Sequence, residues 1–322
     1  MFTPRDNDRH SGLYFTQANI QRAGQYAKKS PFKAAWSKLH ETTPEQPLLA
    51  VQVEALRFQF DGDSRTGERA AQLLVQMGDL DEDAPYWESL GETLALAQCY
   101  QMLREHPSFE PGQQVHWRDV FWERVSRLNQ PTFELSEPEA LWRAALNMAA
   151  GIVLKREPVF EAGAQVYRQT IDHSVRPEGY IPRAVQVAEG QGLAHQLLSV
   201  AALVLMAEMA QHVGVDLWRY SNRGVSVLTA ATYPLYYYFY PEKWPWGTEV
   251  EIREVRTALQ QDYATGLFRQ HGGFLEMLNG RYEKPLRAIR LILRDIRPVV
   301  DVYGGGLTTL THGIPERQGL FG

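Results

Sequence analysis

The feature that most constrains the fold is a run of about twenty residues, 193–213, whose side chains are apolar nearly all round a helix. It reads LAHQLLSVAALVLMAEMAQHV, and from Leu197 to Val213 the apolar pattern is interrupted by Ser199, Glu208, Gln211 and His212. A helix without a polar face must be buried on every side. The run is too short and too mixed for a membrane span, so we expect the central helix of a soluble protein.

A polar loop leads directly into this apolar run. It begins at Arg176 and contains Gly179 and Pro182, which shape the approach of the backbone to the helix. His195 follows at the mouth of the helix. A cleft lined by loops can meet a rigid core element there, so we look for a functional site at this end of the helix.

Helical periodicity extends over most of the chain, and convincing strand alternation is scarce. Short polar turns separate many of the helical segments, which predicts antiparallel hairpins. Because no linker rich in proline and glycine interrupts the series, we expect one domain over residues 1–322. The predicted helices cover residues 17–29, 31–41, 46–60, 65–79, 86–105, 116–128, 138–154, 157–173, 193–213, 219–236, 249–263 and 280–297.

The predicted helices alternate in composition. Segments 140–154 and 193–213 are apolar nearly all round, whereas segments 157–173 and 249–263 carry charge on one face. This alternation is expected of buried inner helices wrapped by an outer ring. The sequence therefore predicts an all-α fold, an incomplete α/α toroid (barrel) of antiparallel helix hairpins. A helical solenoid is the alternative, although the sequence has no repeat of fixed period.

Composition and motifs exclude several functional classes. The net charge of -5 argues against non-specific binding to nucleic acid or to an anionic membrane. The single cysteine, Cys99, cannot form an intramolecular disulfide. No metal or cofactor is expected, because the sequence contains no H-E-x-x-H, C-x-x-C, G-x-S-x-G or Walker motif. Residues 1–16 lack the apolar core of a secretory signal, which predicts a cytoplasmic protein, or a periplasmic or secreted one if a signal was trimmed.

Short segments along the chain occur in a characteristic order. The loop Glu178-Gly179-Tyr180-Ile181-Pro182 precedes the triplet Leu193-Ala194-His195. Five other short segments contribute to this order, at residues 10–16, 60–63, 70–74, 243–245 and 304–312. This order resembles the alginate lyases, polysaccharide lyases built as α/α toroids. The resemblance implies β-elimination on a uronate-containing, alginate-like polysaccharide.

The resemblance also implies positions for the catalytic groups. The family has an Asn-Asn-His-x-x-Trp segment and, later, an Arg followed by a Leu-His-Tyr triplet. Aligning Trp142 with the family Trp places Glu137-Pro138-Glu139 at the Asn-Asn-His positions. His195 falls at the Tyr position, Ala194 at the His position, and the family Arg has no clear counterpart near Ala188. Arg183 could approach the site from the loop instead.

The chemistry of β-elimination selects candidates among these residues. The enzyme must neutralise the substrate carboxylate and remove the neighbouring C5 proton with a base. His195 is a candidate base, a candidate ligand for a sugar hydroxyl, or a structural histidine. Tyr180 could supply the phenol that the triplet lacks, or pack over the loop. Further candidates for substrate binding are Gln191, Gln196, Asn147, Trp142 and Glu139, although a carboxylate repels an anionic sugar unless it is protonated or paired.

Two surface features would suit an acidic sugar chain. Arg287, Arg290, Arg294 and Arg297 recur along one face of the last predicted helix and could grip carboxylates, or form an ordinary solvated face. The aromatic-rich run 233–240 is followed by Trp244 and Trp246. These rings offer faces on which sugar rings stack, or they pack between helices.

Three functions therefore compete. The first is a polysaccharide lyase-like protein with an acidic polysaccharide or oligosaccharide as partner. The second is a non-catalytic member that binds an acidic glycan or is structural. The third is a glycoside hydrolase on the same toroid, with paired carboxylates among Glu137, Glu139, Asp172 and Glu189. The sequence predicts no oligomeric state.

Overall fold

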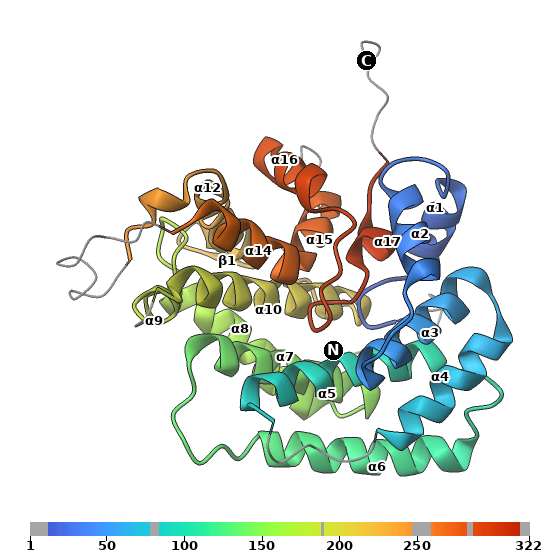
Figure 1. The fold of residues 1–322 in the computed structure, drawn as a ribbon. Helices are drawn as coiled ribbons and strands as arrows, with labels where there is room; N and C mark the ends of the chain where they lie inside the picture. The colour runs from blue at the N-terminus through green and yellow to red at the C-terminus, as the bar shows by residue number, and fades with distance from the viewer. Residues whose placement is uncertain (1–11, 78–83, 188–189, 247–258, 282–285, 316–322) are drawn as a thin grey trace.

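The computed structural model describes residues 12–77, 84–187, 190–246, 259–281 and 286–315, and these are predominantly helical (Figure 1). The helices are α1 (Gln17–Gln25), α2 (Phe32–Glu41), α3 (Pro47–Asp61), α4 (Ser64–Gln76), α5 (Tyr86–Leu103), α6 (Pro111–Leu128), α7 (Glu137–Val153), α8 (Glu157–Gln169), α9 (Pro182–Val185), α10 (Gly192–His212), α11 (Val227–Thr232), α12 (Leu235–Phe239), α14 (Gln261–His271), α15 (Gly273–Arg281), α16 (Arg287–Ile296) and α17 (Thr308–His312). A π-helix, η1 (Thr170–Ser174), a 3-10 helix, η2 (Pro241–Lys243), and two short strands, β1 (Ser221–Asn222) and β2 (Val225–Ser226), complete the described elements.

The long helices form hairpins, each with an inner and an outer member. Helices α3 and α4, α5 and α6, and α7 and α8 pack in pairs, and α3, α5, α7 and α10 also pack on one another in succession. The inner helices α5 and α10 are buried along nearly their whole length, whereas α4, α6 and α8 bury one face. The all-α toroid predicted from alternating helix composition is therefore confirmed.

The first and last described helices, α1 and α17, pack together and close the ring of helices. Helix α15 packs on α10 and α17, α17 packs on α1 and α2, and these pack on α3 (Figure 1). Polar bonds tie the same segments together: the Asn19 amide donates to the Thr311 carbonyl at 2.8 Å, and the Gln52 amide donates to the Val302 carbonyl at 2.6 Å. One cluster of buried apolar side chains extends from Leu13 to Leu310.

Helix α10 is the buried core element that the sequence predicts. Among the described residues it is the one helix with the length and hydropathy to cross a membrane, and 83% of its apolar window is buried inside the fold. Burial on all sides is expected of a core helix in a toroid. After α10, Gly214 adopts a left-handed φ of 83° and the Val215 amide donates to the Ala210 carbonyl at 2.9 Å, which closes the helix end.

Glycines allow α7 and α8 to approach closely. A Cβ atom on Gly163 would lie 2.4 Å from the Ala144 carbonyl oxygen, and one on Gly151 would lie 2.5 Å from the Phe160 backbone nitrogen. Each glycine therefore faces the backbone of the partner helix. Because glycine has no side chain at these two positions, α7 and α8 can pack more closely than they could with any other residue there.

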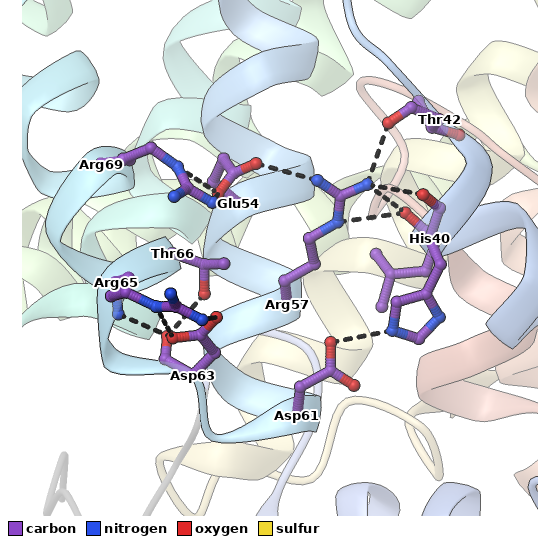
Figure 2. A network of polar contacts seen from close by, with 10 residues as sticks. His40, Thr42, Glu54, Arg57, Asp61, Asp63, Arg65, Thr66 and Arg69 are labelled. Carbon is purple, nitrogen blue, oxygen red and sulfur yellow. Dashed lines mark hydrogen bonds and ion pairs between the residues drawn. The ribbon is translucent and has the colours of Figure 1, made fainter.

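A polar network centred on the buried Glu54 connects α2, α3 and α4 (Figure 2). The Glu54 carboxylate pairs with Arg57 at 2.9 Å and with Arg69 at 2.7 Å. The Arg57 guanidinium also donates to the backbone carbonyls of Leu39, His40 and Thr42. Arg57 thus satisfies carbonyls at the end of α2 that have no partner within the helix.

The predicted segments differ from the observed elements mainly in the last third of the chain. The predicted helix 219–236 begins instead with the hairpin of β1 and β2, because Arg223 and Gly224 adopt left-handed φ values of 53° and 77° and form a tight turn. The predicted helix 157–173 ends at Gln169 and continues as the π-helix η1. The prediction missed most of α14 and all of α17, and it missed α15 up to its last two residues; residues 249–258 and 282–285 lie outside the described residues.

Candidate functional site

The first two turns of α5, α7 and α10 meet at one end of the ring. Trp87 on α5 packs edge-on against Trp142 on α7, with ring centroids 4.6 Å apart. The Trp142 indole donates to the Leu198 carbonyl of α10 at 2.9 Å. Tyr303, from the loop before α17, packs edge-on against Trp87 with centroids 6.0 Å apart. These contacts bring three separate parts of the chain to the start of α10.

His195 lies in the first turn of α10 at this end and is partly buried. Its Nδ1 atom is buried and has no hydrogen-bond partner among the described residues. Burial lowers the pKa of His195, and the carboxylate of Glu139 on α7 opposes part of that shift. The imidazole is therefore neutral at neutral pH, which is the form that can accept a proton.

Glu139 and Glu137, at the start of α7, have partners of their own. The Glu139 carboxylate accepts from the Ser136 backbone amide at 2.8 Å and from the Ser136 hydroxyl at 2.6 Å, which forms a capping box. The Glu137 carboxylate is buried and lies 3.8 Å from Arg183. Burial raises the pKa of Glu137, and the charge of Arg183 partly offsets this.

The loop before α10 is fixed by Gln196, the neighbour of His195. The Ile181 amide donates to the Gln196 side chain at 3.0 Å, and the Gln196 amide donates to the Gly179 carbonyl at 3.1 Å. Gly179 has a φ of 104°, and a Cβ atom there would lie 2.4 Å from the Thr229 carbonyl oxygen, so no other residue fits easily. Gln196 therefore positions Tyr180 by holding the backbone on both sides of it.

Tyr180 belongs to an aromatic cluster beside α10. Its ring centroid lies 4.8 Å from that of Trp246 and 5.7 Å from that of Tyr233. The Trp246 indole donates to the Tyr233 hydroxyl at 2.8 Å. Trp244, 8% exposed, packs near the start of α10, where a Cβ atom on Gly192 would lie 3.3 Å from its ring.

The remaining predicted residues divide between this end of the ring and other places. Trp142 is buried, Gln191 is exposed just before α10, and Arg183 is exposed beside Glu134 and Glu137. Asn147 exchanges two side-chain hydrogen bonds with Asn129, at 2.8 and 3.0 Å, so it belongs to the packing of α6 against α7.

The predicted arginine face lies on α16, which packs on α12, α14 and α15. Arg287, Arg290 and Arg294 are exposed there. Arg297 instead makes two hydrogen bonds, at 2.7 and 2.8 Å, to the carboxylate of buried Glu276 on α15.

The carboxylates considered for a hydrolase do not form a free pair among the described residues. Asp172 accepts from Tyr220 and from Asn222, each at 2.9 Å. Glu137 and Glu139 are two residues apart on one helix and are occupied as described above. Glu189 lies outside the described residues. The described residues also contain no group of three His, Cys, Asp or Glu side chains that could hold a metal ion.

Four residues at this end of the ring were not predicted: Tyr86, Trp87, Arg143 and Tyr303. The charges of Arg143 and Glu139 both act on the Tyr86 phenol, whose pKa is raised chiefly by burial. Arg143 follows Glu139 by four residues, so the two side chains share a face of α7. This spacing was a signal in the sequence. Tyr303, by contrast, reaches the site through the fold, where its ring covers Gly91 of α5.

The family model described as alginate lyase matches residues 16–244. The chain belongs to the alginate lyase family. No curated protein sequence matched it.

Three solved structures share the fold of this alginate lyase family member at low identity. Alginate lyase A1-III from Sphingomonas species A1 is 14% identical, with a TM-score of 0.75 over 96% of this chain and 97% of that one. A histidine-to-alanine variant of A1-III in complex with a tetrasaccharide has a TM-score of 0.73 at 14% identity and covers 97% of both chains. An alginate lyase from Bacteroides ovatus is 12% identical, with a TM-score of 0.64 over 95% of this chain and 99% of that one.

Proposed function

We propose that this chain cleaves a uronate-containing polysaccharide by β-elimination, with the His195 imidazole as the base. The observation that carries the proposal is the position of His195, where the resemblance to alginate lyases puts the proton-transferring Tyr. Its Nδ1 atom is buried without a partner among the described residues, and burial lowers its pKa. A neutral, incompletely hydrogen-bonded imidazole is suited to accept a proton.

In the proposed reaction His195 removes the C5 proton of a uronate residue. The electron pair forms the C4–C5 double bond, the C4–O bond breaks, and the leaving oxygen takes up a proton. Tyr180 is our candidate donor of that proton, because Gln196 fixes its backbone next to the start of α10. Arg143 is our candidate for neutralising the substrate carboxylate as negative charge develops. No metal takes part in this scheme, and Trp87 and Tyr303 offer aromatic faces to sugar rings.

A second candidate function is acidic-glycan binding without cleavage. The observation in its favour is that Glu137 and Glu139 stand at the positions of the family's Asn-Asn-His, and that the Glu139 carboxylate is already hydrogen-bonded within a capping box. A binding protein needs neither a base nor a neutralising donor. It would retain the polymer without releasing product.

The test measures turnover of a panel of uronic-acid polymers by the ultraviolet absorbance of the unsaturated product. The wild type should release product from at least one polymer, and His195→Ala should abolish release with a melting temperature close to wild type. His116→Ala, at an exposed position on α6, is the matched control and should remain active. Turnover retained by His195→Ala together with a lower melting temperature would make His195 a structural residue. Polymer binding without product would favour the second candidate.

A further inference from the structure

A second polar hollow lies at the other end of α10. It has a volume of about 310 Å³, and we call it the Arg22 pocket; its lining includes Arg22, Glu208, Gln211, His212, Arg281 and His312. His195 and His212 are 17 residues apart on one helix, which corresponds to about 25 Å along its axis. The Arg22 pocket is therefore separate from the candidate site at His195.

The buried acid of the Arg22 pocket is already neutralised. Glu208 is 2% exposed and forms two hydrogen bonds with the Arg281 guanidinium, of which the Nε bond is 3.0 Å long. The Nε2 atoms of His212 and His312 each lie 3.6 Å from the Glu208 carboxylate. Burial alone would raise the pKa of Glu208, but these two histidines and Arg281 hold it well below its usual range. Glu208 therefore does not need a further cation from a ligand.

Among the described residues, Arg22 is the cation in this region that has no ion pair of its own. Glu208 is bonded to Arg281, and the neighbouring buried acid, Glu276, is bonded to Arg297. Arg22 lies within electrostatic reach of Glu208, Glu276 and Arg281, and its Nε atom is buried with no hydrogen-bond partner among the described residues. Within the part of the chain that the structure describes, three guanidinium groups thus face two carboxylates, which leaves one positive charge without a matching acid.

An aromatic ring lies next to the Arg22 pocket. An adjoining hollow of about 370 Å³ shares Gln211 and Arg281 with it and is also lined by Trp218. The Arg281 guanidinium lies 5.3 Å from the centroid of the Trp218 ring. The Trp218 indole nitrogen is buried with no hydrogen-bond partner among the described residues. The Arg22 guanidinium could bind the carboxylate of an acidic sugar, and the Trp218 ring could pack against the sugar ring.

We propose that the Arg22 pocket binds a single acidic sugar residue, with the sugar carboxylate on Arg22 and the sugar ring near Trp218. The volume falls within the usual range for small-molecule pockets. The carboxylate requirement follows from the charges of the pocket, whereas the choice of a uronate sugar rests on the function proposed above. A uronate bound here would be held away from the reacting end of the ring.

The test is calorimetric titration of the intact protein with D-glucuronate, D-glucose and acetate. The wild type should bind glucuronate, and bind glucose and acetate at least tenfold more weakly. Arg22→Gln should weaken glucuronate binding about tenfold or more, because a charged hydrogen bond is lost. Arg65→Gln is the matched control, since the Arg65 side chain is 84% exposed on α4, paired with Asp63 (Figure 2), and it should bind like the wild type.

Two further variants test the binding site independently of Arg22→Gln. Gln211→Glu adds a negative charge at an exposed position of the rim and should also weaken binding about tenfold, even if Arg22→Gln does not fold. His195→Ala should leave this binding unchanged, so failure of the lyase proposal and failure of this one are distinguishable. Absence of glucuronate binding, equal affinity for acetate, or full affinity in both Arg22→Gln and Gln211→Glu would overturn the proposal.

Discussion

At the scale of single residues, the candidate site is marked by His195, a side chain whose buried Nδ1 atom has no hydrogen-bond partner among the described residues. His195 could be selected from the sequence because it stands at the junction of a polar loop and an apolar helix. The sequence could not indicate that Glu139, from α7, would be the charge that acts on it, since this depends on how two helices pack. Trp87 and Tyr303 reach the same place from distant parts of the chain for the same reason.

The pH dependence of turnover tests the role of His195. Because burial lowers the pKa of His195, the imidazole stays neutral to a lower pH than an ordinary histidine. We expect the acid limb of kcat/KM to have its midpoint below about pH 6.5. Glu139→Gln removes the charge that raises this pKa while it keeps a capping-box side chain, so the limb should move to still lower pH. A limb that stays in place or moves upward in Glu139→Gln would contradict the assignment.

Arg143 provides a second test at this scale. If its guanidinium neutralises the substrate carboxylate in the transition state, Arg143→Gln should lower kcat by about 10²–10³, as removal of a charge-stabilising donor typically does. Arg127→Gln, at an exposed position on α6, is the control and should keep the wild-type kcat. An effect of Arg143→Gln on KM alone would indicate binding of substrate and transition state to the same extent.

At the scale of elements, the helices from α1 to α8 and helix α10 were predictable from the sequence, whereas several short helices in the last third of the chain were not. Helices α3, α5, α7 and α10 carry sustained apolar patterns, and Pro47, Pro111 and Pro138 mark the starts of α3, α6 and α7. The last third of the chain contains short helices whose burial depends on the ring around them. The hairpin of β1 and β2 was missed because the prediction extended the helix that contains α11 back across the turn at Arg223 and Gly224.

The close contact between α7 and α8 predicts that adding one methyl group at Gly163 lowers the stability of the fold. Gly163→Ala should lower the free energy of unfolding by about 1–3 kcal/mol, because the added methyl group would overlap the Ala144 carbonyl. Gly112→Ala is the matched control, since a Cβ atom there meets nothing within 4 Å. Urea denaturation of both variants would measure the difference. Equal stability of the two would mean that α7 and α8 are not packed this closely.

His271, at the junction of α14 and α15, predicts that the folded protein loses stability at acidic pH. Burial lowers the pKa of His271 to about 4, below the value of about 6.5 expected in the unfolded chain. The unfolded state therefore binds the proton more readily, and the folded state loses stability as the pH falls below 6.5. Between pH 7 and pH 5, the wild type should lose up to about 2 kcal/mol more unfolding free energy than His271→Gln. Exposed His116→Gln should lose as much as the wild type, and an equal loss in all three proteins would refute the prediction.

At the scale of the whole molecule, the ring is closed where the first and last described helices pack together. The His312 imidazole bonds to the Tyr14 carbonyl at 2.8 Å, and α17 packs on α1 and α2. We therefore propose that residues 1–322 unfold as one cooperative unit. Calorimetry should give one thermal transition, and limited proteolysis should give no stable half. Two separated transitions would show that the ring is made of independent parts.

Two separate polar sites lie at opposite ends of α10, and we propose that cleavage takes place at the one that contains His195. The most direct measurement is the mass of the new chain ends that the wild-type protein produces from a uronate polymer. β-Elimination predicts a new non-reducing end that is lighter by one water than the hydrolysis product and absorbs in the ultraviolet. New ends with the mass of hydrolysis products, or no new ends at any pH between about 5 and 9, where a shifted imidazole would titrate, would contradict the claim.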